Sequence, residues 1–212
     1  MLLALDTSSA FVSVALHDGA DVVWERASAQ RMKHAEQLAP LIDAALAETG
    51  LVRQDLTAVA AGTGPGPFTG LRVGLVTART LAAVLDVPVY GVCSLDVLAV
   101  EAVDSGAVDG GFLVATDARR KEVYLAGYDG DGRRVSGPVV DRPERLRTDS
   151  PVVGEGARLY PDAFPRAVGP ERPSAGWLAR TVAEERAELT DPEPLYLRRP
   201  DAAMPGAPKR VS

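Results

Sequence analysis

The chain has 212 residues and a formal net charge of −6, and 46% of its residues are hydrophobic and 25% charged. Such a composition is ordinary for a globular protein of one large or two small domains. A single cysteine excludes a disulfide framework, and the acidic balance, with only 5% aromatic residues, disfavours a nucleic-acid-binding platform.

The first half of the chain alternates short apolar runs with amphipathic ones, which predicts an α/β fold. Residues 2–6 lack a basic n-region, and no apolar run reaches the ~18 residues of a membrane helix. We therefore expect a cytoplasmic protein without a membrane partner. The expected elements are strands 2–6, 11–17 and 22–26, helix 34–49, strand 56–61, helix 69–85, strand 88–92 and helix 94–103.

A turn rich in glycine and proline, residues 62–70, leads into the longest expected helix. Its glycines adopt positive φ at little cost, its prolines end the preceding strand, and Thr69 is suited to cap the helix. A glycine-rich turn before a helix is also typical of phosphate sites. The phosphate interpretation is weak here, because Pro65 and Pro67 lack N–H donors and no Lys-Ser/Thr pair follows.

The helix that follows this turn is apolar almost all round, whereas a surface helix is polar on the face turned away from the core. Small residues recur in it every four positions, at Gly70, Gly74, Ala78 and Ala82. Two interpretations stay open. The helix is either the centre of a large core, or it is shared between its own sheet and a partner helix that packs closely on the small residues.

The second half of the chain repeats the pattern of the first. Placing Asp117 on Asp6 aligns segment 112–117 with segment 2–6, and each copy continues into an Asp-Gly hairpin. This self-similarity indicates a duplicated unit and two related lobes, although alternation alone also makes β-hairpins look alike. The expected divisions are an N-terminal lobe at 1–105, a smaller C-terminal lobe at 106–200 with a helix at 174–188, and a frayed tail at 201–212.

Few side chains suggest catalysis. His17 lies beside a hairpin, where we expect it to be exposed. His34 opens a helix, but the position one turn later is Leu38 rather than a second histidine, which argues against a helical metal pair. Cys93 has no histidine near it in the sequence, so we expect a small core residue rather than a nucleophile.

The acidic strand ends allow two interpretations. Asp6 ends the first strand and is followed by Thr7 and Ser8, at the edge where α/β lobes bind ligands. These three residues are our candidates for a metal or nucleotide phosphate, although strand-end aspartates more commonly form turns. The equivalent Asp117 is followed by Ala-Arg-Arg-Lys, which weakens the ligand interpretation.

Three stretches resemble the bacterial TsaB (YeaZ) family. They are Leu5-Asp6-Thr7-Ser8, the block Gly-Pro-Gly-Pro-Phe-Thr-Gly-Leu-Arg-Val-Gly at 64–74, and Asp-Ala-Arg-Arg-Lys-Glu-Val-Tyr at 117–124. The second block is highly specific, and the order and spacing extend over essentially the whole chain. The resemblance implies an α/β, actin-like (ASKHA) fold of two related RNase H-like lobes.

The resemblance also implies a function. The family provides a non-catalytic dimerisation or scaffold subunit for the complex that forms N6-threonylcarbamoyladenosine (t6A37) in tRNA. The catalytic subunit is the paralogue TsaD, whose helix carries a H-x-x-x-H metal site, and TsaE is an ATPase that joins the pair. The implied partners are therefore TsaD, TsaE and a second copy of the chain, with tRNA bound indirectly through the complex. No cofactor is expected to bind the isolated chain tightly, and ATP or ADP is expected only within the complex.

The resemblance places the partner interface on the helices of the first lobe. The implied contacts are His34, Leu38, Leu41, Ala45, Phe68, Gly70, Val73, Gly74, Thr77, Ala78 and Ala82. On this hypothesis, Gly74→Leu should block the partner, and it should leave the lobe folded if that face is exposed in the monomer. Two rival functions stay open: an autonomous actin-like ATP-dependent enzyme, and a glycoprotease-type metallopeptidase.

Overall fold

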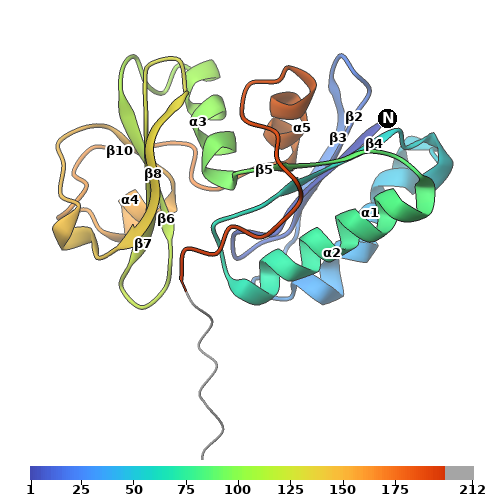
Figure 1. Cartoon of the computed structure of the whole chain (residues 1–212), viewed down its shortest axis with the longest axis horizontal. Coiled ribbons are helices and arrows are strands. Elements are labelled where there is room, and N and C mark those ends of the chain that lie inside the picture. Colours follow the sequence, from blue (N-terminus) through green and yellow to red (C-terminus); the bar gives the residue numbers. More distant parts are fainter. Residues whose placement is uncertain (199–212) are drawn as a thin grey trace, which may run out of the picture.

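Two five-stranded sheets lie side by side in the computed structural model, which describes residues 1–198 (Figure 1). The expected tail, 201–212, falls outside the described residues. The elements of the first half are β1 (Leu2–Asp6), β2 (Ser13–His17), β3 (Val22–Ala27), α1 (His34–Thr49), η1 (Arg53–Asp55), β4 (Ala58–Gly62), α2 (Phe68–Leu85), β5 (Val89–Val92) and α3 (Ser94–Asp104). Those of the second half are β6 (Phe112–Asp117), β7 (Val123–Tyr128), β8 (Arg134–Asp141), η2 (Pro143–Arg145), β9 (Val152–Val153), α4 (Glu155–Leu159), β10 (Ala167–Val168) and α5 (Ala175–Ala183).

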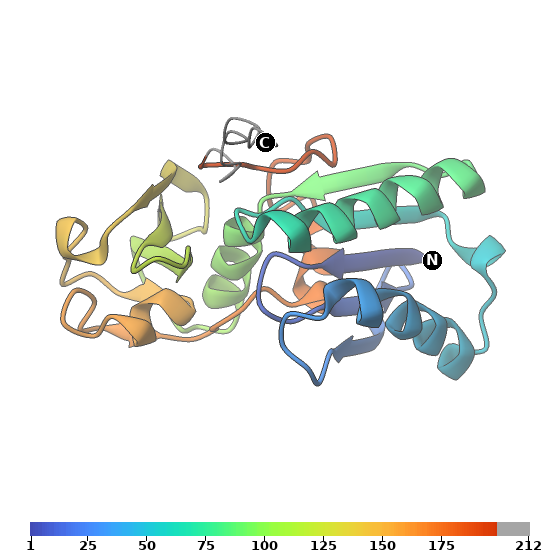
Figure 2. The same ribbon diagram turned by 90° about the horizontal axis from the view of Figure 1, so that it is seen from below.

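The first sheet is covered by helices on both faces. Its strand order is β3-β2-β1-β4-β5, with β1 antiparallel to β2 and parallel to β4. Helices α1 and α2 pack on one face and α5 on the other (Figures 1 and 2). Because side chains alternate along a strand, Leu3 and Leu5 join the cluster beneath α1 and α2, whereas Ala4 packs against α5.

The second sheet repeats the first. Its order is β8-β7-β6-β9-β10, with β6 antiparallel to β7 and parallel to β9. The same order and strand directions therefore occur twice, which confirms the duplicated unit and the actin-like arrangement of two RNase H-like lobes. The short strand β10 was not expected from the sequence, because it has only two residues and carries no alternating pattern.

Helix α5 corrects the expected division of the chain. We assigned 106–200 to the second lobe, but α5 lies against β1, β2 and β3 of the first sheet. Its apolar face, with Leu178 and Ala179, packs on the alanine-lined side of that sheet. The chain then stays with the first lobe, because Thr190 pairs with Gly91 at the edge of β5. The sequence predicts an amphipathic helix here, but periodicity cannot say which of two similar sheets it covers.

Three local expectations can be checked directly. Ser174 caps α5, since its hydroxyl accepts the Trp177 N–H. Thr69 does not cap α2, which begins at Phe68 without a side-chain cap. His17 is 2% exposed rather than on the surface, because β2 is an inner strand of a sheet covered on both faces.

Helix α2 is the one described helix that is long and apolar enough to cross a bilayer, with 18 residues and a mean hydropathy of 1.3. Length and composition alone give this result, and core helices of globular proteins meet the same criterion. One face of α2 covers β4 and β1, and its outer face carries Arg72 and Arg79.

Candidate interaction face and interlobe cleft

The small-residue stripe of α2 faces its own sheet, which corrects our expectation that a partner helix packs on it. Gly70, Gly74, Ala78 and Ala82 are all buried. A β-carbon on Gly70 would lie 2.7 Å from the Thr7 carbonyl oxygen. The glycines thus allow α2 to lie close to the end of β1. Spacing of small residues predicts a close approach, but it does not identify the neighbour.

The opposite side of α2, which we call the outer face, is open. Val76 is 61% and Val84 77% exposed. The other exposed residues of this face are Thr69, Arg72, Arg79, Thr80 and Ala83. Three expected partner contacts, Phe68, Val73 and Thr77, are half-buried at its margins, where a partner could reach them. Sequence reasoning missed Val76 and Val84, although both lie off the small-residue stripe of a helix that is apolar all round.

Helix α1 lies beside α2, as expected, but contributes less surface. Leu38 and Ala45 are buried in the core beneath it, which corrects their assignment as partner contacts, while Leu41 is half-buried. His34 is also buried, and its Nε2 lies 2.9 Å from the Ser9 carbonyl oxygen. Because a carbonyl oxygen only accepts, Nε2 carries the hydrogen and donates the hydrogen bond. This contact anchors α1 to the β1–β2 turn.

A C-terminal strap, residues 190–196, borders the outer face. The sequence indicates an extended segment from Pro194 onward, but its position against α2 was not expected. Tyr196 stacks on Phe68 with ring centroids 4.9 Å apart, and its hydroxyl accepts a hydrogen bond from Arg72 Nε at 3.1 Å. Arg79 pairs with Glu193 at 2.6 Å. The strap also crosses the edge of β5 (Figure 1). It fixes the N-terminal end of the outer face to the rest of the first lobe.

The candidate ligand residues at the end of β1 form a closed network. Asp6 is 1% exposed, and its Oδ1 accepts hydrogen bonds from the Ser8 N–H and hydroxyl. Its Oδ2 accepts one from the Ser94 hydroxyl at 2.6 Å and lies 1.8 Å from where a β-carbon on Gly62 would stand. Burial raises the pKa of Asp6, although the hydrogen bonds from Ser94 and Ser8 oppose this. Asp6 therefore joins three segments of the first lobe rather than presenting an open carboxylate.

Thr7 is equally enclosed, so of the three candidates only Ser8 lines the cleft between the lobes. The cleft holds a cavity of about 10 Å³, which is room for roughly one water molecule. Ligand pockets have volumes of about 300 Å³ or more. The expectation that Asp6 and Thr7 contact a ligand is thus wrong for this conformation of the chain.

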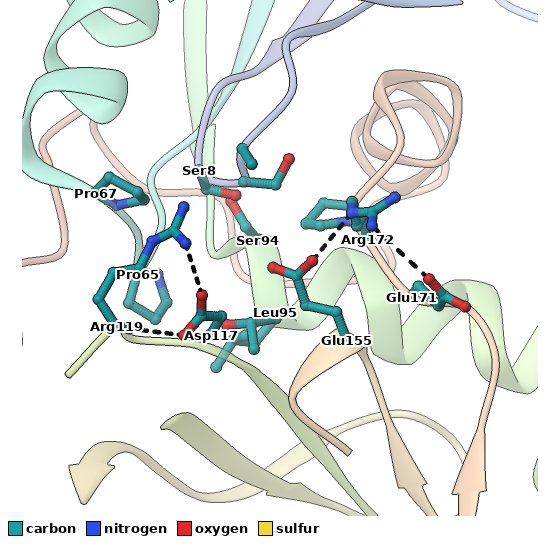
Figure 3. A pocket seen from close by; sticks show the side chains of 14 residues that line it. Ser8, Pro65, Pro67, Ser94, Leu95, Asp117, Arg119, Glu155, Glu171 and Arg172 are labelled. Carbon is teal, nitrogen blue, oxygen red and sulfur yellow. Dashed lines mark hydrogen bonds and ion pairs between the residues drawn. The ribbon is translucent and has the colours of Figure 1, made fainter. Parts of the chain in front are cut away.

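Ion pairs fill the cleft. Asp117 pairs with Arg119 at 3.1 Å on one side, and Glu155 pairs with Arg172 at 3.0 Å on the other (Figure 3). Asp117 also accepts the Arg119 N–H at 2.8 Å, which makes it a turn-former. The two strand-end aspartates that the repeat aligns are therefore used differently, and the second copy does not add a ligand to the first.

A larger groove of about 560 Å³ lies between the strap and β8. Asp96 on α3 accepts a hydrogen bond from the Tyr128 hydroxyl at 2.7 Å and lies 3.7 Å from Arg134. These contacts hold α3 against the second sheet. Cys93, at the edge of this groove, is 6% exposed, and burial raises the pKa of its thiol to about 12. Cys93 packs in the core cluster with Leu95 and Phe112, and a thiol with a raised pKa carries little of the reactive thiolate.

No group of three His, Cys, Asp or Glu side chains within residues 1–198 has an arrangement that could hold a metal ion. One turn after His34 on α1 stands Leu38, which is buried in the core and cannot ligate a metal.

Comparisons with known proteins agree with one another. A family model described as "TsaD: tRNA N6-adenosine threonylcarbamoyltransferase" matches residues 22–175. The tRNA threonylcarbamoyladenosine biosynthesis protein TsaB of Escherichia coli is 33% identical over 173 residues, which cover 76% of this chain and 74% of that protein. A protein of Mycobacterium tuberculosis described as uncharacterized is 42% identical over 206 residues, which cover 95% of this chain and 93% of that protein.

Solved structures show the same likeness. The crystal structure of a protein from Pseudomonas aeruginosa, described as similar to peptidase YEAZ, matches with a TM-score of 0.78 and 32% identity, covering 93% of this chain and 99% of that one. A structure of YeaZ from the same organism matches with a TM-score of 0.76 and 32% identity, covering 92% of this chain and 99% of that one.

Proposed function

The chain belongs to the TsaB (YeaZ) family, and we propose that it is the non-catalytic scaffold subunit of a tRNA N6-threonylcarbamoyladenosine transferase complex, where it binds and activates TsaD. The family relationship supports a role in this tRNA modification. The finer assignments, to a scaffold and to TsaD as the partner, are supported by the outer face of α2.

The outer face carries the proposal because residues 1–198 leave its valines largely uncovered. Val76 and Val84 are 61% and 77% exposed on a helix whose other face is fully packed. Burying an exposed valine side chain contributes about 1.5 kcal/mol or more. Arg72 and Arg79 flank these valines and give the face the polar rim that is usual for protein interfaces. A second copy of the chain could use the same face when TsaD is absent.

The closed cleft is consistent with a subunit that does not catalyse alone. The ATP-dependent alternative expects a nucleotide at the strand ends beside Ser8, where the cavity measures about 10 Å³. Hydrolysis of ATP by the purified chain would favour that alternative. Stoichiometric zinc binding would favour the metallopeptidase.

The test replaces two outer-face valines with charged residues. In the double variant Val76→Glu and Val84→Glu, two carboxylates would have to be buried at the interface without partners, so affinity for TsaD should fall at least about thirtyfold. The matched control is Val135→Glu with Val139→Glu, which alters valines 66% and 45% exposed on β8 of the other lobe. The control should bind as the wild type does.

Calorimetric titration with purified TsaD measures both variants, and circular dichroism establishes that they fold. If the α2 variant is folded and binds TsaD with wild-type affinity, the outer face is not the interface. If the wild-type chain does not bind TsaD at all, the scaffold proposal is wrong.

A further inference from the structure

One end of the outer face carries a cation that residues 1–198 do not neutralise. Arg72 is exposed near the N-terminal end of α2, and no carboxylate of the described residues pairs with it. Arg79 lies two turns later on the same face and is paired with Glu193 of the strap at 2.6 Å. Within the described residues, Arg79 therefore has its carboxylate, whereas Arg72 lacks one.

Two aromatic side chains hold Arg72 in place. Its guanidinium lies over the Phe68 ring, 3.8 Å from the ring centroid, and its Nε donates a hydrogen bond to the Tyr196 hydroxyl at 3.1 Å. Tyr196 is fixed in turn, because its ring stacks on Phe68 and the strap is hydrogen-bonded to the first lobe through Leu195 and Thr190. The guanidinium is thus fixed at one of its faces and at one of its nitrogens.

The other two nitrogens of Arg72, Nη1 and Nη2, have no hydrogen-bond acceptor among residues 1–198. Their N–H groups lie in one plane, in the geometry that matches the two oxygens of a carboxylate. An exposed arginine normally moves freely, and a partner that binds it must restrict that motion. Here Phe68 and Tyr196 restrict the motion beforehand, so that a carboxylate meets a preorganised guanidinium.

The surroundings of Arg72 favour an acidic protein contact. The outer face has two arginines and no carboxylate of its own, in a chain of net charge −6. Phe68 and Tyr196 provide apolar rings beside Arg72, and the exposed Val76 follows one turn later. Arginine and tyrosine are enriched among the residues that contribute most to binding at protein interfaces. The charge and the composition of this end of the face therefore complement an acidic side chain on a protein partner.

We propose that Arg72 anchors the partner at the N-terminal end of the outer face, and that the partner presents an aspartate or glutamate carboxylate to its guanidinium. This inference rests on the proposed function for the identity of the partner, TsaD, and it adds the chemical group that is recognised. Val76 and Val84 supply the apolar part of the interface, and Arg72 sets its orientation, because a bidentate ion pair is directional. Tyr196 is a positioning residue, since it acts through Arg72.

The experiment measures affinity for TsaD without tRNA, by titration calorimetry on whole-chain variants that circular dichroism shows to be folded. Arg72→Gln removes the charge and the bidentate geometry, and Arg72→Lys removes the geometry alone. The matched control is Arg180→Gln on α5, which covers the opposite face of the first sheet. Arg180 also lies over an aromatic ring, at 5.5 Å from the centroid of Trp177. Binding should weaken about thirtyfold in Arg72→Gln and about tenfold in Arg72→Lys, and it should not change in the control.

A second pair of measurements tests how Arg72 is recognised. Tyr196→Phe should weaken binding about threefold in the wild-type chain and not at all in Arg72→Gln, because its effect requires the arginine. Aspartates and glutamates on the surface of TsaD are also changed, one at a time, to asparagine or glutamine. One of these changes should weaken binding to the wild-type chain about fivefold or more and leave binding to Arg72→Gln unaltered.

The outcomes separate this inference from the scaffold proposal. Wild-type affinity in folded Arg72→Gln overturns the inference and leaves the scaffold proposal intact, because Val76 and Val84 test that proposal independently. Loss of affinity in Arg72→Gln without coupling to any carboxylate of TsaD also overturns the inference. So does a loss that appears only after tRNA is added, since it assigns Arg72 to a phosphate group. If the wild-type chain does not bind TsaD, the scaffold proposal and this inference fail together.

Discussion

The Thr7 hydroxyl oxygen lies 2.2 Å from the point where a β-carbon on Gly74 would stand. Thr7 is 1% exposed, and its hydroxyl has no hydrogen-bond partner among residues 1–198. Gly74→Ala should therefore destabilise the protein by about 1–3 kcal/mol, the cost of overpacking a core, despite the better helix propensity of alanine. Urea unfolding measures this change.

The double variant Thr7→Ala with Gly74→Ala is the control, because it removes both Thr7 side-chain atoms that Gly74→Ala would contact. It should recover most of the lost stability. If Gly74→Ala alone is as stable as the wild type, α2 does not lie as close to β1 as described here. We expected Gly74→Leu to leave the lobe folded only if the face with Gly74 is exposed, and the same contact shows that this condition is not met.

The elements of the first lobe follow closely from the sequence, because their patterns are local. The helix at 34–49 has the predicted bounds, since its apolar positions repeat over four turns and Gly50 ends it with φ of 72°. The Asp-Gly turn and the apolar runs of β1 and β2 likewise depend on adjacent residues. The repeated strand order is predictable for the same reason, since each copy carries its own hairpin.

The candidate site could be predicted only in part, because it depends on which neighbour a face meets. The stripe containing Gly74 indicates a close approach, but only the structure assigns it to β1. Asp6 was recognised as a strand-end carboxylate, yet its enclosure depends on Ser94, which lies 88 residues later in the chain. Periodicity cannot predict the position of the strap, because the strap forms no helix or strand. Its contact between Tyr196 and Phe68 joins residues that are 128 positions apart in the sequence.

Glu101 on α3 should make stability depend on pH. Burial raises its pKa to about 7, and the carboxylate of Glu25 adds to this effect. The pKa of Glu101 in the folded protein lies above its value in the unfolded chain. The contribution of Glu101 to the free energy of unfolding is therefore complete below about pH 4.5 and is lost as the pH rises through about 7. Glu101→Gln should match the wild type near pH 5 and be more stable near pH 8. The gain should be well under the roughly 1.4 kcal/mol per pKa unit of a fully buried group, because the side chain is only partly buried.

Urea unfolding across this pH range checks the prediction, and Glu25→Gln provides a second variant. The amide oxygen of Gln can still accept the Gly176 N–H that Glu25 now accepts, while the neighbouring charge is removed. The decline in stability should then move to lower pH. Parallel stability curves for wild type and Glu101→Gln would show that Glu101 ionises normally in the folded protein.

The strap should depend on Tyr196 for its attachment to α2. Its ring stacks on Phe68, and stacked aromatic pairs contribute about 0.5–1.5 kcal/mol beyond burial. Tyr196→Ala removes both the stack and the hydrogen bond from Arg72, so the strap should open more often. Amide hydrogen exchange reports this through Leu195 and Thr190, whose N–H groups donate to the carbonyl oxygens of Thr63 and Gly91 at 2.9 Å. Exchange at these amides should accelerate about tenfold, whereas amides of β1 should not change.

Tyr196→Phe is the matched control, because it keeps the stack and loses only the hydrogen bond, and it should give an intermediate rate. If Tyr196→Ala exchanges at the wild-type rate, the pairing of Thr190 with Gly91 holds the strap by itself, and the aromatic contact does not stabilise it.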